Sequence, residues 1–183
     1  MKFLSLIALS VLFAGAAFAE SLEKPDEEMR LLIEPVVGYQ FLSRSFPESY
    51  TEGMLTYGGR VVYGGENLAG EFEFQYGSSS ESFPDLNETS NTIYVEAKLG
   101  ARKVLPFQEN IHLLLRGGLQ ASRFSDQIGS SGVSSWYTQS VTYEPYVGVG
   151  LLFNFFKSLT LTVEETYVLS TSIETSFGFR IFI

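Results

Sequence analysis

Acidic and basic side chains recur at every second position in several segments of the chain. Residues 71–75 read Glu-Phe-Glu-Phe-Gln, so Glu71 and Glu73 share one parity while Phe72 and Phe74 share the other. In an extended strand these two sets point to opposite faces of the sheet. Carboxylates on one face can pair with bases from neighbouring strands, and a buried charge is tolerated only when it is compensated. The chemistry available here is therefore charge pairing, either as a fixed network or as a gated path for ions.

The candidate charge network contains seven acids and five bases from one parity of the strand-like segments. A nearly balanced set favours a structural network of salt bridges over an ion path, because unpaired interior charges are costly. We predict that Arg60, Arg116 and Arg180 each contact a glutamate, and that Arg60 is the nearest partner for Glu71 and Glu73. The full set is Glu34, Arg60, Glu71, Glu73, Glu96, Lys98, Arg102, Arg116, Glu144, Glu164, Glu174 and Arg180.

Catalytic chemistry has little support in the sequence. The chain has one histidine, His112, and no cysteine, and a serine nucleophile needs a base within hydrogen-bond reach. No segment has the spacing of a metal-ligand cluster or of a phosphate-binding loop. We therefore expect no enzymatic activity, no cofactor, no catalytic residue and no metal site. A barrel enzyme that modifies lipid A is the less favoured alternative.

Eight amphipathic segments supply the elements that position these side chains. In each of them apolar residues alternate with glycine, small polar or charged residues, and no helical period of comparable length appears. The segments are residues 31–43, 53–64, 68–77, 92–103, 111–123, 138–153, 159–169 and 172–183. The pattern predicts an all-β protein with eight antiparallel strands.

The bulk of the two faces predicts which one points inward. One face is rich in leucine, valine, isoleucine, phenylalanine and tyrosine, whereas the other is rich in glycine, serine, threonine and charged residues. An eight-stranded barrel is just wide enough to be filled by side chains, and the smaller polar set fits that space better. We therefore predict an eight-stranded antiparallel up-and-down transmembrane β-barrel, with its aromatic face in lipid. A soluble barrel with the opposite facing is the alternative.

The N-terminus has the pattern of a secretory signal peptide. Lys2 precedes an apolar run from Phe3 through Phe13, and Ala17-Phe18-Ala19 supplies small residues at the cleavage positions. No later stretch approaches the roughly 18 consecutive apolar residues of a transmembrane helix. The predicted regions are a signal peptide over 1–19, a flexible periplasmic leader over 20–29 and an outer-membrane β-barrel over 30–183.

The net charge and the lengths of the connections indicate which molecules the protein meets. The formal net charge of −9 becomes −10 when Lys2 is removed with the signal peptide, which argues against nucleic acid as a partner. Short and long connections alternate, as expected when both termini lie in the periplasm. The longer, polar connections are residues 44–52, 78–91 and 124–137. We expect a monomer in outer-membrane lipid and lipopolysaccharide, inserted by the barrel-assembly machinery, with a surface ligand at these loops.

The C-terminal residues 176–183 carry a family resemblance. Ser176, Gly178, Ile181 and Ile183 match the C-terminal barrel-assembly signal of bacterial outer-membrane proteins, although Ile183 stands where the commonest form has phenylalanine. Together with the eight segments, the chain resembles the small outer-membrane β-barrel family of the OmpA/OmpX type. The resemblance implies a bacterial outer-membrane protein with a salt-bridged interior and a structural or surface-interaction role through its extracellular loops. A porin-like narrow channel for ions or small hydrophobic solutes, as in OmpW-like barrels, is the alternative.

Glu165 departs from the alternation. It shares the parity of Leu161, Val163 and Tyr167, which is predicted to face lipid. Two explanations are open. Either Glu165 lies near the rim, where a charge is tolerated, or a bulge at Glu164-Glu165 shifts the register.

Overall fold

Nine β-strands make up most of the described chain. The computed structural model describes residues 29–44, 50–65, 67–83, 88–130, 133–156, 159–169 and 172–181. The strands are β1 (Arg30–Arg44), β2 (Tyr50–Gly64), β3 (Leu68–Phe83), β4 (Glu88–Gln108), β5 (Ile111–Ser130), β6 (Val133–Thr138), β7 (Thr142–Phe156), β8 (Leu159–Val168) and β9 (Ser172–Ile181). Within the described residues, no helix is long and apolar enough to cross a membrane.

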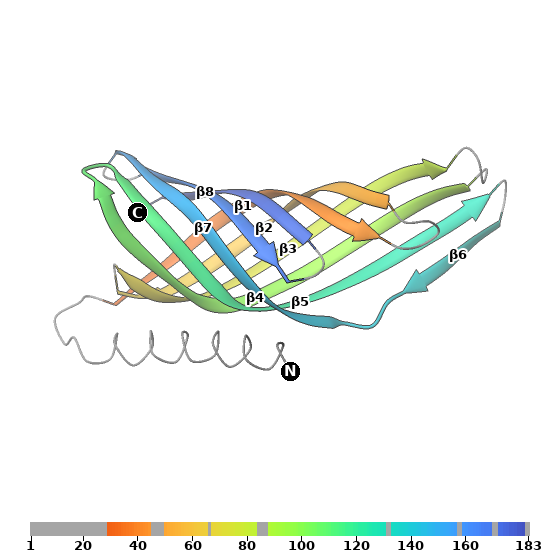
Figure 1. Ribbon diagram of the computed structural model, residues 1–183, viewed down its shortest axis with the longest axis horizontal. Coiled ribbons are helices and arrows are strands. Elements are labelled where there is room, and N and C mark those ends of the chain that lie inside the picture. Colours follow the sequence, from red (N-terminus) through yellow and green to blue (C-terminus); the bar gives the residue numbers. More distant parts are fainter. Residues whose placement is uncertain are drawn as a thin grey trace.

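Eight of the nine strands close into a barrel. Their order around the ring is β1, β2, β3, β4, β5, β7, β8 and β9, and every neighbouring pair is antiparallel. The ring is completed by β1 and β9, which pair from Val36–Gly178 to Leu42–Ser172. The predicted all-β, eight-stranded antiparallel barrel is therefore confirmed, and Figure 1 shows it with its long axis horizontal.

The strands on one side of the barrel continue beyond its closed part. β4 and β5 contain 21 and 20 residues, whereas β8 and β9 contain 10 each. β5 pairs with β7 as far as Ser122, and then with β6 from Ser125 to Ser130. The longer, polar connections predicted over 78–91 and 124–137 consist mostly of extended strand, because β3 and β4 continue into the first and β5 and β6 into the second. Figure 1 shows these hairpins projecting at the right, and we call that end of the barrel the hairpin end.

The other end, where β1 begins and β9 ends, is called the terminus end.

The barrel turns its apolar side chains outward and its charged ones inward. Phe72 and Phe74 expose 48% and 47% of their surface, whereas Glu71 and Glu73 expose 3% and 1%. This is the inverse of a soluble barrel, in which the apolar face fills the interior.

A small apolar cluster lies inside the barrel near the hairpin end. Leu42, Met54 and Tyr94 are buried together, and Phe124 packs against them with its ring centroid 4.6 Å from that of Tyr94. Leu42 and Met54 lie close to the ends of β1 and β2 that are joined at the hairpin end. The cluster therefore lies between the charged interior and that end of the barrel.

Glu165 faces outward in an unbroken register. It pairs with Val149 on β7 and with Thr175 on β9, and the only irregularity in the β7–β8 pairing lies between Asn154 and Phe156. A bulge at Glu165 is therefore excluded. The residue lies near the end of β8 at Val168, and it accepts a hydrogen bond of 3.3 Å from the Thr175 hydroxyl. Glu165 is thus an outward charge close to the rim at the hairpin end.

Two adjacent glycines on β2 give a matched test of how closely the strands approach. A Cβ on Gly58 would overlap the carbonyl oxygen of Phe74 and lie 2.8 Å from Gln75 Cα, whereas the nearest atom to a Cβ on Gly59 is the Glu34 carbonyl oxygen at 3.7 Å. We expect Gly58→Val to lower the free energy of unfolding by about 1–3 kcal/mol. Gly59→Val is expected to change it by less than about 0.5 kcal/mol. Urea titration of both variants in lipid vesicles measures the difference, and equal effects would contradict this account.

Candidate functional site

The barrel interior holds a continuous cluster of ion pairs. Eleven of the twelve residues predicted as a charge network belong to it, and each is joined to at least one other by a salt bridge. Seven of the eight barrel strands contribute these side chains, and β7 adds Tyr146. We call this set the interior network. Its members are Glu34, Arg60, Glu71, Glu73, Glu96, Lys98, Arg102, Arg116, Glu164, Glu174 and Arg180.

Arg60 on β2 lies at the centre of the interior network. Its side chain is fully buried. Nε donates to Glu73 on β3 at 2.6 Å, and Nη1 donates to Glu164 on β8 at 2.6 Å and to Glu34 on β1 at 3.2 Å. One guanidinium therefore links carboxylates from three strands on different sides of the barrel.

Arg116 on β5 makes a second set of three contacts. Nε donates to Glu71 at 2.6 Å and Nη2 donates to Glu73 at 2.9 Å, while Nη1 donates to Glu164. The guanidinium carbon lies 5.7 Å from the centre of the Tyr146 ring, and the Tyr146 hydroxyl donates to Glu71 at 2.9 Å. Arg60 and Arg116 thus share Glu73 and Glu164, so that neither base can move without disturbing the other.

Lys98 on β4 is surrounded by three carboxylates. Its ammonium donates to Glu96 at 2.6 Å, to Glu73 at 3.0 Å and to Glu174. The side-chain amide of Gln75 donates to Glu73 at 2.9 Å and to Glu174 at 2.6 Å, which holds both acceptors in place. One oxygen from each of the three glutamates lies within 4.8 Å of the others, as in a metal site. In this protein the lysine ammonium takes the place of the cation.

Glu34 accepts hydrogen bonds from several arginines toward the terminus end. Arg102 Nη1 lies 3.1 Å from both carboxylate oxygens, and Arg180 Nε donates at 2.7 Å. With Arg60, three guanidinium groups contact this one buried carboxylate. Basic charge therefore predominates at the terminus end of the interior network.

The interior network is close to electroneutral as a whole. It contains six glutamates and five bases, which leaves a formal charge of −1. Arg60, Arg116 and Lys98 each contact three carboxylates, so loss of any one of them leaves several buried charges uncompensated. Such an arrangement holds the strands in one register and fills the barrel with charged side chains. It is suited to a structural role.

Glu144 is the twelfth predicted member of the charge network. It is only partly buried on β7, and its Cα is paired with that of Gln120 on β5, toward the hairpin end. Its place in the alternation puts it on the inward face, like the members of the interior network. Along the barrel axis, however, it lies closer to the hairpin end. Position along the barrel axis depends on the stagger of the strands, which sequence parity does not report.

Several uncharged members of the site were missed by a search for charges alone. They are inward-facing residues that donate to the network or to one another. A search for any polar residue on the inward parity would have found them, because they alternate with outward apolar residues. These residues are Gln40, Gln75, Tyr94, Gln120 and Tyr146.

The other predicted features are placed as follows. Ser176 and Gly178 are buried inward on β9, and Ile181 is the last residue of that strand. Ile183, the signal peptide over 1–19 and most of the leader over 20–29 lie outside the described residues. Their roles in targeting and assembly stay predictions.

Comparison with known proteins identifies the fold. No family model matches the sequence, and no curated relative does. The structure is similar to that of Neisserial surface protein A, with 14% identity, a TM-score of 0.63 and coverage of 85% of this chain and 99% of that one. It is also similar to the attachment invasion locus protein Ail of Yersinia pestis, solved with the heparin analogue sucrose octasulfate, at 12% identity and a TM-score of 0.56, covering 84% and 96%. The chain therefore has the fold of the small eight-stranded outer-membrane barrels that it was predicted to resemble.

Proposed function

We propose that the chain is a bacterial outer-membrane protein whose filled barrel presents a projecting hairpin sheet to partners at the cell surface. The outward aromatic face, the polar interior and the fold shared with outer-membrane barrels support placement in that membrane. With the terminus end in the periplasm, the hairpin end lies outside the cell. The barrel then serves as the anchor, and the hairpins as the contact surface.

The observation that carries this proposal is the β5–β6 hairpin beyond the closed barrel. Trp136 and Tyr137 on β6 expose 58% and 53% of their surface. Among the described residues, β6 pairs with β5 along one edge only, so its other edge can accept an extended segment of a partner. Exposed aromatic side chains beside a strand edge are typical of a protein-binding surface.

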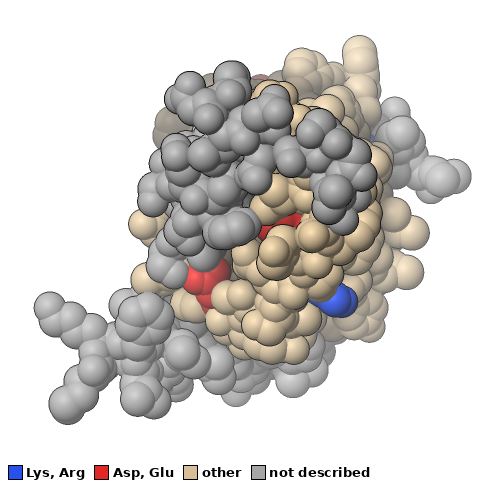
Figure 2. Space-filling view, turned by 90° about the vertical axis from the view of Figure 1, so that its right-hand side faces the viewer, with Lys and Arg blue, Asp and Glu red and all other residues tan. Residues whose placement is uncertain are grey.

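The acidic net charge of the chain favours one kind of partner over another. Figure 2 views the hairpin end and shows acidic atoms there together with a smaller basic group. The chain as a whole has a formal charge of −9. A polyanion such as the heparin analogue bound to Ail would be repelled by this surface. We therefore propose a protein partner that is neutral or basic where it meets the hairpins.

Orientation can be tested cleanly because the chain contains no cysteine. Trp136→Cys is expected to react with a membrane-impermeant maleimide in intact cells. Asn110→Cys, in the turn between β4 and β5 at the terminus end, is expected to react only after lysis. Labelling of position 110 in intact cells would overturn the proposed orientation.

Partner binding is tested by photo-cross-linking in intact cells. A benzophenone amino acid at position 136 is expected to give a discrete cross-linked product with a protein. The matched control places it at Phe155, which is 58% exposed on β7 near the terminus end, and is expected to give none. A folded, surface-labelled variant that gives no product at position 136 would contradict the proposed contact surface.

We propose a structural rather than a conducting or catalytic interior. Planar-bilayer recording of the folded protein is expected to show no resolvable conductance, because buried bases with three carboxylate partners each fill the barrel. Steady single-channel currents would favour the narrow channel instead.

A further inference from the structure

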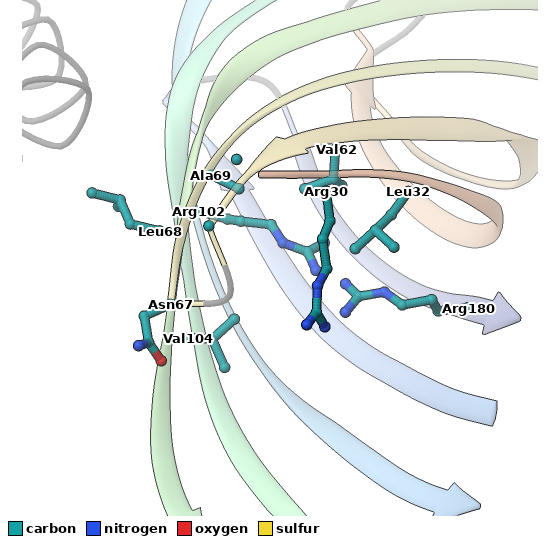
Figure 3. A pocket seen from close by; sticks show the side chains of 11 residues that line it. Arg30, Leu32, Val62, Asn67, Leu68, Ala69, Arg102, Val104 and Arg180 are labelled. Atoms are coloured by element: carbon teal, nitrogen blue, oxygen red, sulfur yellow. The ribbon is translucent and has the colours of Figure 1, made fainter. Parts of the chain in front are cut away.

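A small pocket opens at the terminus end of the barrel, opposite the hairpins. Its volume is about 60 Å³, and three arginines line it together with Asn67 and the apolar Leu32 and Val62. Figure 3 shows the guanidinium groups of these arginines, Arg30, Arg102 and Arg180, pointing toward the same space. The pocket therefore gathers guanidinium groups from β1, β4 and β9.

Three of the described residues that line this pocket are basic. None of the described residues that line it is acidic. The carboxylate that contacts Arg102 and Arg180 is that of Glu34, which is fully buried and is also bonded to Arg60. Guanidinium groups that converge on one space can share the oxygens of a further anion through charge-assisted hydrogen bonds.

The donors have the geometry that oxyanions require. Arg102 is 3% exposed and contacts Glu34 through Nη1, while Arg180 contacts it through Nε and Nη2. Each guanidinium carries five N–H donors in a planar fork that matches carboxylate and phosphate oxygens. The adjoining apolar side chains of Leu32 and Val62 reduce local screening and strengthen such contacts.

We propose that this pocket binds a small oxyanion, a phosphate or a carboxylate group, between Arg30, Arg102 and Arg180. The site is distinct from the hairpin surface and does not depend on the surface role. The oxyanion can come from the surroundings as a free anion. It can also come from the chain itself, since Asp26, Glu27 and Glu28 shortly precede Arg30 in the sequence.

The test is a titration of the chain from residue 20 onward, folded in maltoside micelles, which contain no phosphate. Inorganic phosphate is added while the Nε–Hε resonances of the arginines are recorded by NMR. Saturable shifts are expected for Arg102 and Arg180. Arg30→Gln is expected to raise the dissociation constant about tenfold, the effect of losing one charge-assisted contact. Lys103→Gln removes an exposed base on the neighbouring outward position of β4 and is expected to leave binding unchanged.

A second variant separates the two sources of the oxyanion. In Asp26→Asn/Glu27→Gln/Glu28→Gln the nearby carboxylates are neutral, and a free anion meets no internal competitor. Phosphate binding by this variant alone supports the pocket with the chain as its usual ligand, and binding by both supports a free anion. Absence of saturable binding in both chains overturns the proposal. Equal weakening by Arg30→Gln and Lys103→Gln also overturns it, because the effect would then be one of general charge.

Discussion

Replacing Arg60 with methionine is expected to lower the free energy of unfolding by about 3–5 kcal/mol, the cost of leaving a buried charge without its partner. Methionine keeps much of the side-chain volume but removes the contacts to Glu34, Glu73 and Glu164. The network charge then becomes more negative in a space where none of these three side chains reaches water. The expected result is a barrel that folds with difficulty and unfolds at much lower urea concentration.

Urea titration in phosphatidylcholine vesicles, followed by circular dichroism, measures this change. Arg123→Met is the matched control, because Arg123 is an exposed residue on β5 and its loss is expected to cost less than about 0.5 kcal/mol. Adding Glu164→Gln to Arg60→Met removes one negative charge, which returns the formal charge of the interior network from −2 to −1. This second change is expected to restore about 0.5–3 kcal/mol. If Arg60→Met behaves like Arg123→Met, the interior network does not hold the barrel together.

Replacing Lys98 with alanine is expected to convert a salt-bridge site into a calcium site. The change removes the ammonium but leaves Glu73, Glu96 and Glu174, whose oxygens lie within 4.8 Å of one another. Without a cation these carboxylates are expected to destabilise the barrel by about 3–5 kcal/mol. Carboxylate oxygens are the ligands that calcium prefers, so calcium present during refolding should restore part of the loss.

The response to calcium is measured as a shift in the urea midpoint of Lys98→Ala. At a calcium concentration 100 times the dissociation constant, the gain is about 2.7 kcal/mol. The wild-type protein is expected to show no shift, and Lys98→Ala/Glu174→Gln is expected to lose the response. A calcium-independent midpoint for Lys98→Ala would show that the three carboxylates do not act as one cation site.

The closed barrel could be predicted from sequence because each barrel strand separates its residue types by parity. Glu71 and Glu73 alternate with Phe72 and Phe74, and the volume available inside eight strands favours the polar set. The sequences of the projecting hairpins do not separate apolar from polar residues in this way. The described side chains of β6, residues 135–138, are all exposed, so the two faces of this strand do not differ in burial. The short strand β6 was therefore not predicted.

The members of the charge network were more predictable than their contacts. Arg60 lies opposite Glu73 in the β2–β3 hairpin, and adjacency along the chain is enough to suggest that pair. The contact between Arg60 and Glu164 crosses the barrel from β2 to β8. It depends on the tilt and stagger of the strands, which alternation in the sequence leaves undetermined.

The pairing of β1 with β9 has a consequence for the order in which the protein assembles. Arg180 on the last strand contacts Glu34 on the first, so this ion pair forms only when the ring closes. If β9 slipped by one residue against β1, its inward side chains, Glu174 and Arg180 among them, would turn outward, where a charge beside lipid is costly. An incorrectly closed ring is therefore much less stable than the correct one. The charged side chains of β9 thus select the register in which the ring closes.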